Sequence, residues 1–256
     1  MKKYELTNEV KVELGVTLHR IRALVDIVRN GVKAGDLGGW VEKEPNLNQE
    51  HDAWVSGDAR VFGDARVSDN ALVSDNAQVS GDAWVSGNAQ VYGDAWVSGN
   101  AQVYGNAQVA GNAQVAGNAQ VYGDAWVFGN AQVYGNAQVS GNAQVYGDAW
   151  VSGDALVFGN AQVSGNARVA GNARVAKTAH VLTVGPIGSR NDTTTFFRAK
   201  SSAGFAISVC CGCFRGTVDE FRAKVKQTHG DSKYGEAYQL AADLAETQIE
   251  IDKEAL

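Results

Sequence analysis

Hydrophobic and polar positions follow a six-residue period through the middle of the chain. From Ala53 to Val181, 22 consecutive triplets read alanine, any residue, valine, and no insertion interrupts them. In an extended segment, residues two apart point to the same side. Alanine and valine therefore share one side and the residues flanking valine share the other, which predicts one very short strand in each hexad.

Each hexad ends in two residues that are typical of a bend. Of the 21 residues at the first of these positions, 18 are glycine, and the exceptions are Asp69, Asp75 and Lys177. The second position is asparagine 13 times, aspartate 7 times and Thr178 once. These residue types adopt positive φ at low cost, so the chain is expected to turn every six residues.

This spacing allows two architectures, an antiparallel meander with Gly-Asn hairpins or a solenoid whose coils stack in parallel. The solenoid is favoured because four-residue hairpin strands bury little surface. Coils with identical inward residues instead stack alanine and valine into continuous internal rows. The predicted interior is narrow and made almost entirely of these two residue types.

The repeats resemble those of a known family. Segments such as Val85-Ser-Gly-Asn-Ala-Gln-Val91 and Val115-Ala-Gly-Asn-Ala-Gln-Val121 are similar to the hexapeptide repeat of left-handed parallel β-helices. The resemblance implies three hexads per triangular coil and about seven coils, a prism roughly 35 Å long at the ~4.8 Å spacing of strands. The flanks also resemble those of uncharacterised phage and prophage hexapeptide-repeat proteins, in the segments Thr17–Leu24, Lys33–Glu42 and Cys211–Phe221.

The sequence divides into an N-terminal β cap (1–52), the β-helix (53–182) and a C-terminal α+β cap or association domain (183–256). Both open ends of a solenoid need covering. Alternating runs at 10–14 and 18–24 predict N-terminal strands, and runs at 193–197 and 205–210 predict a hairpin. Thr217 and Glu220 form a capping box that predicts a helix to about Gln227. A second helix is expected at 233–249, with one face formed by Tyr234, Tyr238, Ala241 and Leu244, which packs on the hairpin or against a subunit.

The outward positions indicate a binding surface. Thirteen of them are aromatic and few are charged, so at least one face is expected to be an interface, with another copy first and a foreign partner second. An 18-residue coil would stack Tyr104 under Tyr122, and Phe128 under Tyr146. We therefore predict a non-enzymatic scaffold that presents flat Gln, Ser and aromatic faces to a protein, such as a host defence factor or a virion component. The predicted partner-binding residues are Trp126, Phe128, Tyr146, Tyr104, Tyr122 and Trp150.

Two other functions remain open. Many proteins that carry this repeat are acyltransferases that use acetyl-CoA or a related thioester, usually as trimers, with a histidine base. His180 is the one histidine within the repeats and would be that base. Alternatively, the chain could be a sponge for a nucleotide-like ligand at subunit clefts, with Arg168 and Arg174 as candidate ligand-binding residues, in line with Trp150 and Leu156.

Composition and charge exclude several classes. The 256 residues carry a net charge of −6 without a basic stripe, which argues against nucleic-acid binding. The longest apolar run is far short of the ~20 residues of a membrane span, and no signal-peptide pattern is evident. Cys210, Cys211 and Cys213 with His229 could be zinc ligands, but adjacent strand residues point to opposite sides, so free thiols in a cytoplasmic setting are expected. We predict no metal and no cofactor. We predict a homo-oligomer, and the family resemblance implies a trimer.

Overall fold

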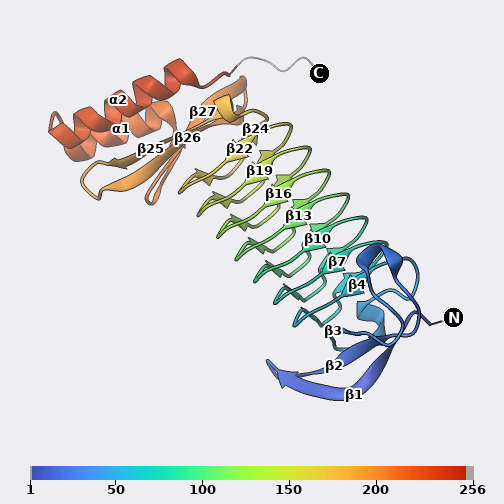
Figure 1. Ribbon diagram of the computed structural model, residues 1–256. Coiled ribbons are helices and arrows are strands. Elements are labelled where there is room, and N and C mark those ends of the chain that lie inside the picture. The colour runs from blue at the N-terminus through green and yellow to red at the C-terminus, as the bar shows by residue number, and fades with distance from the viewer. Residues whose placement is uncertain (1, 252–256) are drawn as a thin grey trace.

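The computed structural model describes residues 2–251 and consists of a long solenoid with a cap at each end (Figure 1). The N-terminal cap is a β-hairpin beside the first coil, and the C-terminal cap is a sheet covered by two helices. The parallel β-solenoid predicted from the hexads is thereby confirmed. No helix within this part of the chain is long and apolar enough to cross a membrane.

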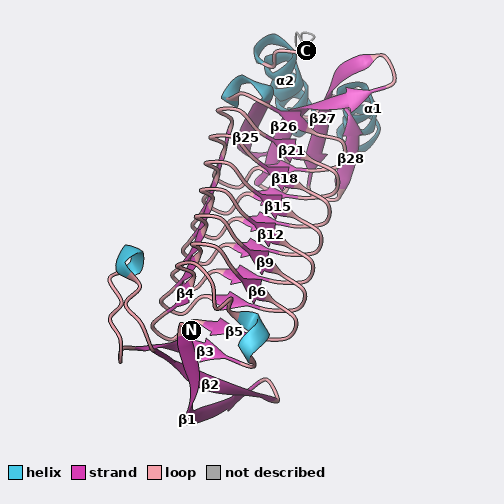
Figure 2. Cartoon of the chain, turned by 90° about the vertical axis from the view of Figure 1, so that its right-hand side faces the viewer, coloured by secondary structure: helices cyan, strands magenta, loops and turns pink. Residues whose placement is uncertain are grey.

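The solenoid has three faces, because each two-residue strand pairs in parallel with the strands three before and three after it. The face that we call the β16 face consists of β4 (Trp54–Val55), β7 (Leu72–Val73), β10 (Gln90–Val91), β13 (Gln108–Val109), β16 (Trp126–Val127), β19 (Gln144–Val145) and β22 (Gln162–Val163). The β12 face consists of β6 (Arg66–Val67), β9 (Trp84–Val85), β12 (Gln102–Val103), β15 (Gln120–Val121), β18 (Gln138–Val139), β21 (Leu156–Val157) and β24 (Arg174–Val175). The β20 face contains β5 (Arg60–Val61), β8 (Gln78–Val79), β11 (Trp96–Val97), β14 (Gln114–Val115), β17 (Gln132–Val133), β20 (Trp150–Val151) and β23 (Arg168–Val169). Figure 2 shows the coils stacked along the prism.

The interior of the prism is formed by the repeated alanine and valine residues. Every one of them between Ala53 and Val175 is at most 1% exposed. Burying a valine side chain contributes about 1.5–3 kcal/mol, so the repetition of one small contact stabilises the whole column. Hydrogen bonds between coils run from each strand to the strand 18 residues later, for example from the Gln114 N–H to the Ala131 oxygen at 2.9 Å.

The first coil begins ahead of Ala53, within the segment predicted as the N-terminal cap. The strand β3 (Leu37–Val41) pairs in parallel with β5, and Leu47 forms a bridge with Val67. Gly39 stands where later coils have alanine, and a Cβ atom there would lie 2.7 Å from the Ala59 oxygen. Glycine is therefore required at this position of the coil. After Leu47, the next residue at the valine position is Val55, eight residues later and not six, so a search for a strict hexad misses this coil.

The rest of the N-terminal cap is an antiparallel hairpin, as expected. It consists of β1 (Tyr4–Glu13) and β2 (Val16–Ala23), and β2 pairs with β3 so that the hairpin continues the β20 face. Two short 3₁₀ turns follow, η1 (Val28–Asn30) and η2 (Glu44–Asn46). The side chain of Tyr4 is fully buried. Its hydroxyl lies 2.8 Å from the main-chain oxygens of both Glu44 and Leu47 and donates a hydrogen bond to one of them.

The last triplet, Ala179 to Val181, is not a solenoid strand, so this part of the repeat prediction is wrong. Residues Thr178–His180 form the 3₁₀ turn η3, and Val181 begins β25 (Val181–Ile187). At the point where the chain leaves the prism, Lys177 and Thr178 occupy the two positions of the bend that elsewhere are mostly glycine and asparagine. The four-stranded antiparallel sheet that follows is completed by β26 (Asp192–Ser201), β27 (Gly204–Cys211) and β28 (Phe214–Thr217).

The strand β26 covers the open end of the prism. The Arg168 N–H donates to Thr195 Oγ1 at 2.9 Å, and the Lys200 N–H donates to the Asn172 oxygen at 3.0 Å. Phe197 packs with the alanine and valine core, whereas its neighbour Phe196 packs on the opposite side against the helices. The alternation of one strand thus joins the two hydrophobic cores.

Two helices cover the outer side of this sheet. The capping box confirms the start of α1 (Val218–His229), since the Glu220 N–H donates to Thr217 Oγ1 and the Thr217 N–H donates to Glu220 Oε2. The second helix, α2 (Lys233–Gln248), also lies where it was predicted. Its expected apolar face is only half correct: Tyr238 and Ala241 are buried, but Tyr234 is 37% exposed and Leu244 is 44% exposed. The helix is rotated so that the small residues Gly235, Ala242 and Ala245 face inward.

Candidate binding surfaces

Each face of the prism carries two outward columns of side chains. The central column contains the residues between alanine and valine, and the lateral column contains the residues after valine. Residues in one column follow one another every 18 residues along the chain, in the register of the paired strands. A side chain in either column is therefore flanked by its counterparts in the coils before and after it, and similar side chains form rows.

The rows of aromatic rings expected from the sequence are present. The rings of Tyr104 and Tyr122 are parallel within 2°, with centroids 5.0 Å apart. The rings of Phe128 and Tyr146 are parallel within 3° and 4.9 Å apart, and Trp126 meets the Phe128 ring edge-on at 6.3 Å. Offset stacking and edge-to-face contacts at such distances are worth about 0.5–1.5 kcal/mol beyond area burial.

The six predicted partner-binding residues do not form one surface. Trp126, Phe128 and Tyr146 share the β16 face, whereas Tyr104 and Tyr122 lie on the β12 face and Trp150 lies on the β20 face. The β16 face also carries Tyr92, in the lateral column. The predicted residues therefore form three groups, of which the group on the β16 face is the largest.

Tryptophan is the most exposed aromatic residue of the solenoid. Trp126 is 44% exposed and Trp150 is 39% exposed. Trp84 and Trp96, which are not among the predicted binding residues, are equally accessible, being 47% and 44% exposed. Trp54 differs from them, because the N-terminal cap covers it and leaves it 1% exposed.

Hydrogen bonds between the two columns orient several of these rings. The indole N–H of Trp84 donates to Ser68 Oγ at 3.0 Å, which is a step of 16 residues from the central to the lateral column of the preceding coil. The hydroxyl of Tyr92 donates to Gln108 Oε1 at 3.2 Å over the same step. Burial raises the pKa of Tyr104, with a smaller contribution from the neighbouring Tyr122 hydroxyl. The rows are thus ordered surfaces with defined ring planes.

The other predicted residues lie at the C-terminal end of the prism. Arg168 stands beside Trp150 and Arg174 beside Leu156 in paired strands, as the coil length implied, but on two different faces. The guanidinium of Arg174 donates to the main-chain oxygens of Asp154 and Ala173. Within a single chain, Arg168 and Arg174 therefore do not face a common ligand.

His180 lies inside the protein. It is 1% exposed, and its Nδ1 accepts a hydrogen bond from the Ala176 N–H at 3.1 Å. This bond helps to close the last coil, where the 3₁₀ turn η3 carries the chain away from the prism. A buried ring whose Nδ1 is engaged by the main chain has a structural part in this end of the solenoid.

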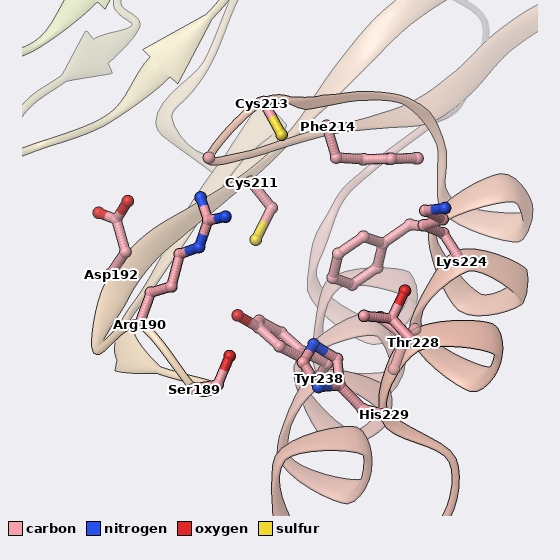
Figure 3. A pocket seen from close by; sticks show the side chains of 13 residues that line it. Ser189, Arg190, Asp192, Cys211, Cys213, Phe214, Lys224, Thr228, His229 and Tyr238 are labelled. Atoms are coloured by element: carbon pink, nitrogen blue, oxygen red, sulfur yellow. The ribbon is translucent and has the colours of Figure 1, made fainter.

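The C-terminal cap contains a cavity of about 230 Å³ between the β25–β26 turn, the β27–β28 turn and the two helices (Figure 3). The thiol of Cys211 points into it and faces Tyr238 and Arg190. Thr194 donates a hydrogen bond to Cys211 Sγ at 3.1 Å. Desolvation, and secondarily the nearby Cys211, raise the pKa of Tyr238 to about 12.

The three cysteines do not converge on a metal site. Cys210 packs into the core of the prism and Cys211 packs on the opposite side of the sheet, as expected for neighbours on a strand, while Cys213 is exposed. His229 lies against the Tyr238 ring instead, with centroids 5.6 Å apart. Between residues 2 and 251, no cluster of three or more His, Cys, Asp or Glu residues could hold a metal ion.

A family model supports the solenoid. The model described as the YdcK beta solenoid repeat matches residues 65–81, 119–135, 131–147, 137–153 and 161–176. The repeats of this chain are similar to that family. All five matches lie between the caps, on the coils that carry the aromatic rows. No curated protein matches the chain.

Proposed function

We propose that the protein is a rigid solenoid scaffold that binds a protein through the β16 face. The observation that carries this proposal is the contiguous patch of Trp126, Phe128 and Tyr146, in which the Trp126 ring remains 44% exposed and the other two rings are half-buried. Tryptophan and tyrosine on a flat, well-ordered surface are typical of the residues that dominate binding energy in protein interfaces.

The favoured partner is a second copy of the chain. A flat face with repeated glutamine and aromatic columns is self-complementary in spacing, because two copies share the same coil distance. Gln108, Gln144 and Gln162 line the same face and supply amide donors and acceptors. The resemblance of the flanks to phage-type proteins supports a host-cell or virion protein as a further partner of the assembled scaffold. The buried setting of His180 gives no support to acyl transfer.

The test is the association of a variant with three charges on this face. We expect Trp126→Glu, Phe128→Glu and Tyr146→Glu together to weaken self-association at least tenfold, measured by light scattering coupled to size-exclusion chromatography. The far-UV circular dichroism should stay unchanged, because these side chains point outward.

A matched control places the same number of charges on another face. Gln102→Glu, Gln120→Glu and Gln138→Glu occupy three successive coils of the β12 face and should leave association within twofold of the original. Equal association of the two triple variants would contradict the proposal, and so would an original chain that stays monomeric at every concentration tested.

A further inference from the structure

The lateral column of the β16 face has a gap in its row of aromatic rings. Reading along the column, Tyr92 is followed by Ala110, then by Phe128 and Tyr146. Where aromatic residues occupy adjacent coils, their rings lie parallel at 4.9 or 5.0 Å. Tyr92 and Phe128 are two coils apart, about 9.6 Å at the ~4.8 Å spacing of strands, so the space of one ring is left between them.

This space is a cavity in the surface. It has a volume of about 280 Å³ and is lined by Tyr92, Gln108, Ala110, Trp126 and Phe128, together with two corner glycines. We call it the Ala110 slot. None of its lining side chains is charged. A ring inside it would stack on both sides at the distances that the column itself uses, and its entry would remove apolar surface from water.

The slot also contains an indole N–H that lacks the serine acceptor found at equivalent places in the prism. At the equivalent places in the prism, the Trp84 indole donates to Ser68 and the Trp96 indole donates to Ser80, each 16 residues earlier. The residue 16 positions before Trp126 is Ala110, whose side chain has no acceptor. Within residues 2–251, the indole N–H of Trp126, which is 44% exposed, donates no hydrogen bond to another residue, and Trp126 and Ala110 line the same cavity. A ligand oxygen near the Ala110 Cβ could take the place that the serine hydroxyl has elsewhere.

We propose that the Ala110 slot receives the phenol ring of a tyrosine presented by a protein partner. This inference rests on the function proposed above and specifies how the partner is recognised. The ring is held between Tyr92 and Phe128, and the hydroxyl accepts the Trp126 indole N–H. Phenylalanine and tryptophan lack the acceptor, because an indole only donates and a phenyl ring has no polar atom. Nucleic acids are disfavoured, since a slot without cationic side chains does not attract phosphates.

The first experiment uses N-acetyl-tyrosinamide as the probe and the indole N–H resonances of the ¹⁵N-labelled protein as the readout. The Trp126 resonance is assigned by its loss in Trp126→Phe. We expect that resonance to shift in a saturable way, and N-acetyl-phenylalaninamide to bind at least fivefold more weakly. Absence of a shift at Trp126, or equal binding of the two probes, would overturn the proposal.

A pair of variants tests the slot itself. Ala110→Tyr fills the gap with a side chain of the protein itself and should weaken binding of the tyrosine probe at least tenfold. Ala116→Tyr is the control: it adds the same side chain to the lateral column of the β20 face, next to Tyr134, and should leave probe binding unchanged. Equal probe binding by Ala110→Tyr and the original chain would also overturn the proposal.

The same variants separate this inference from the proposed function. If Ala110→Tyr retains full association while the triple charge variant of the β16 face loses it, the face is an interface but the slot is not its recognition site. If neither variant changes association, the proposed function itself fails.

Discussion

The corner glycines offer a direct test of how coil stacking determines the repeat. Gly135 has φ +72°, and a Cβ atom built on it would lie 3.1 Å from the Gly153 nitrogen and 3.2 Å from the Gly153 oxygen, in the next coil. Gly171 has a similar φ, +63°, but nothing lies within 4 Å of its Cβ position. The two sites therefore share the backbone conformation and differ in the contact between coils.

The magnitude follows from two contributions. A left-handed conformation costs an L-residue about 1–2 kcal/mol, and the smaller freedom of alanine in the unfolded chain offsets roughly 0.4–1 kcal/mol of this. We expect Gly171→Ala to lower the free energy of unfolding by at most about 1.6 kcal/mol. At Gly135 the close contact with main-chain atoms adds roughly 1–2 kcal/mol, in the range known for overpacking, so Gly135→Ala should cost about 1–3.6 kcal/mol in total.

The assay is urea unfolding followed by circular dichroism, with the slope of the free energy against urea compared between variants. A third variant, Gly135→Asp, tests whether a side chain can compensate. Asp69 and Asp75 occupy the same corner position at φ +57° and +59°, and their carboxylates accept hydrogen bonds at 2.9 Å from the N–H groups of Gly87 and Gly93 in the next coil.

We expect Gly135→Asp to be less destabilising than Gly135→Ala, because its carboxylate can accept the Gly153 N–H in the same way. The reasoning would be refuted if Gly135→Ala and Gly171→Ala lowered stability equally. In that case backbone strain alone, and not the approach of successive coils, would explain the glycines.

Three further predictions concern other parts of the chain. Asn118 donates to Asn136 at 3.1 Å in the corner row, so Asn118→Asp should lose this bond and about 0.5–1.5 kcal/mol in urea unfolding, and unchanged stability would argue against the row. Burial lowers the pKa of Lys3 from 10.5 to about 8, so between these pH values the unfolded chain binds a proton that the folded chain has lost. The free energy of unfolding should therefore rise with pH across this window, and Lys3→Met should abolish the rise. Burial also raises the pKa of the Cys210 thiol, so iodoacetamide should modify Cys213 first and Cys210 last in mass spectra of the native protein, and early modification of Cys210 would contradict its place in the core.

The aromatic rows show how far a regular sequence determines a surface. Once each coil has 18 residues, the neighbours in a column follow from arithmetic, and the stacking of Phe128 on Tyr146 could be predicted without coordinates. The Ala110 slot follows from the same arithmetic, as an alanine in a row of rings. The volume of the slot, and the fact that an indole at this place bonds the residue 16 positions earlier, could be known only from the positions of the side chains.

The sequence alone determined the solenoid, because alternation and bends depend on neighbouring residues and the same local choice is repeated in every hexad. It also determined the two helices, through the capping box and the break at Gly230. Only the tertiary structure decided how the ends are built. The coil at Gly39 and the departure of the chain at Ala179 depend on packing against distant segments, namely β5 and the strand β26 that covers the prism. Contacts between residues far apart in the chain leave no periodic signal, so these boundaries and the cavity beside Cys211 appear only when the chain is folded.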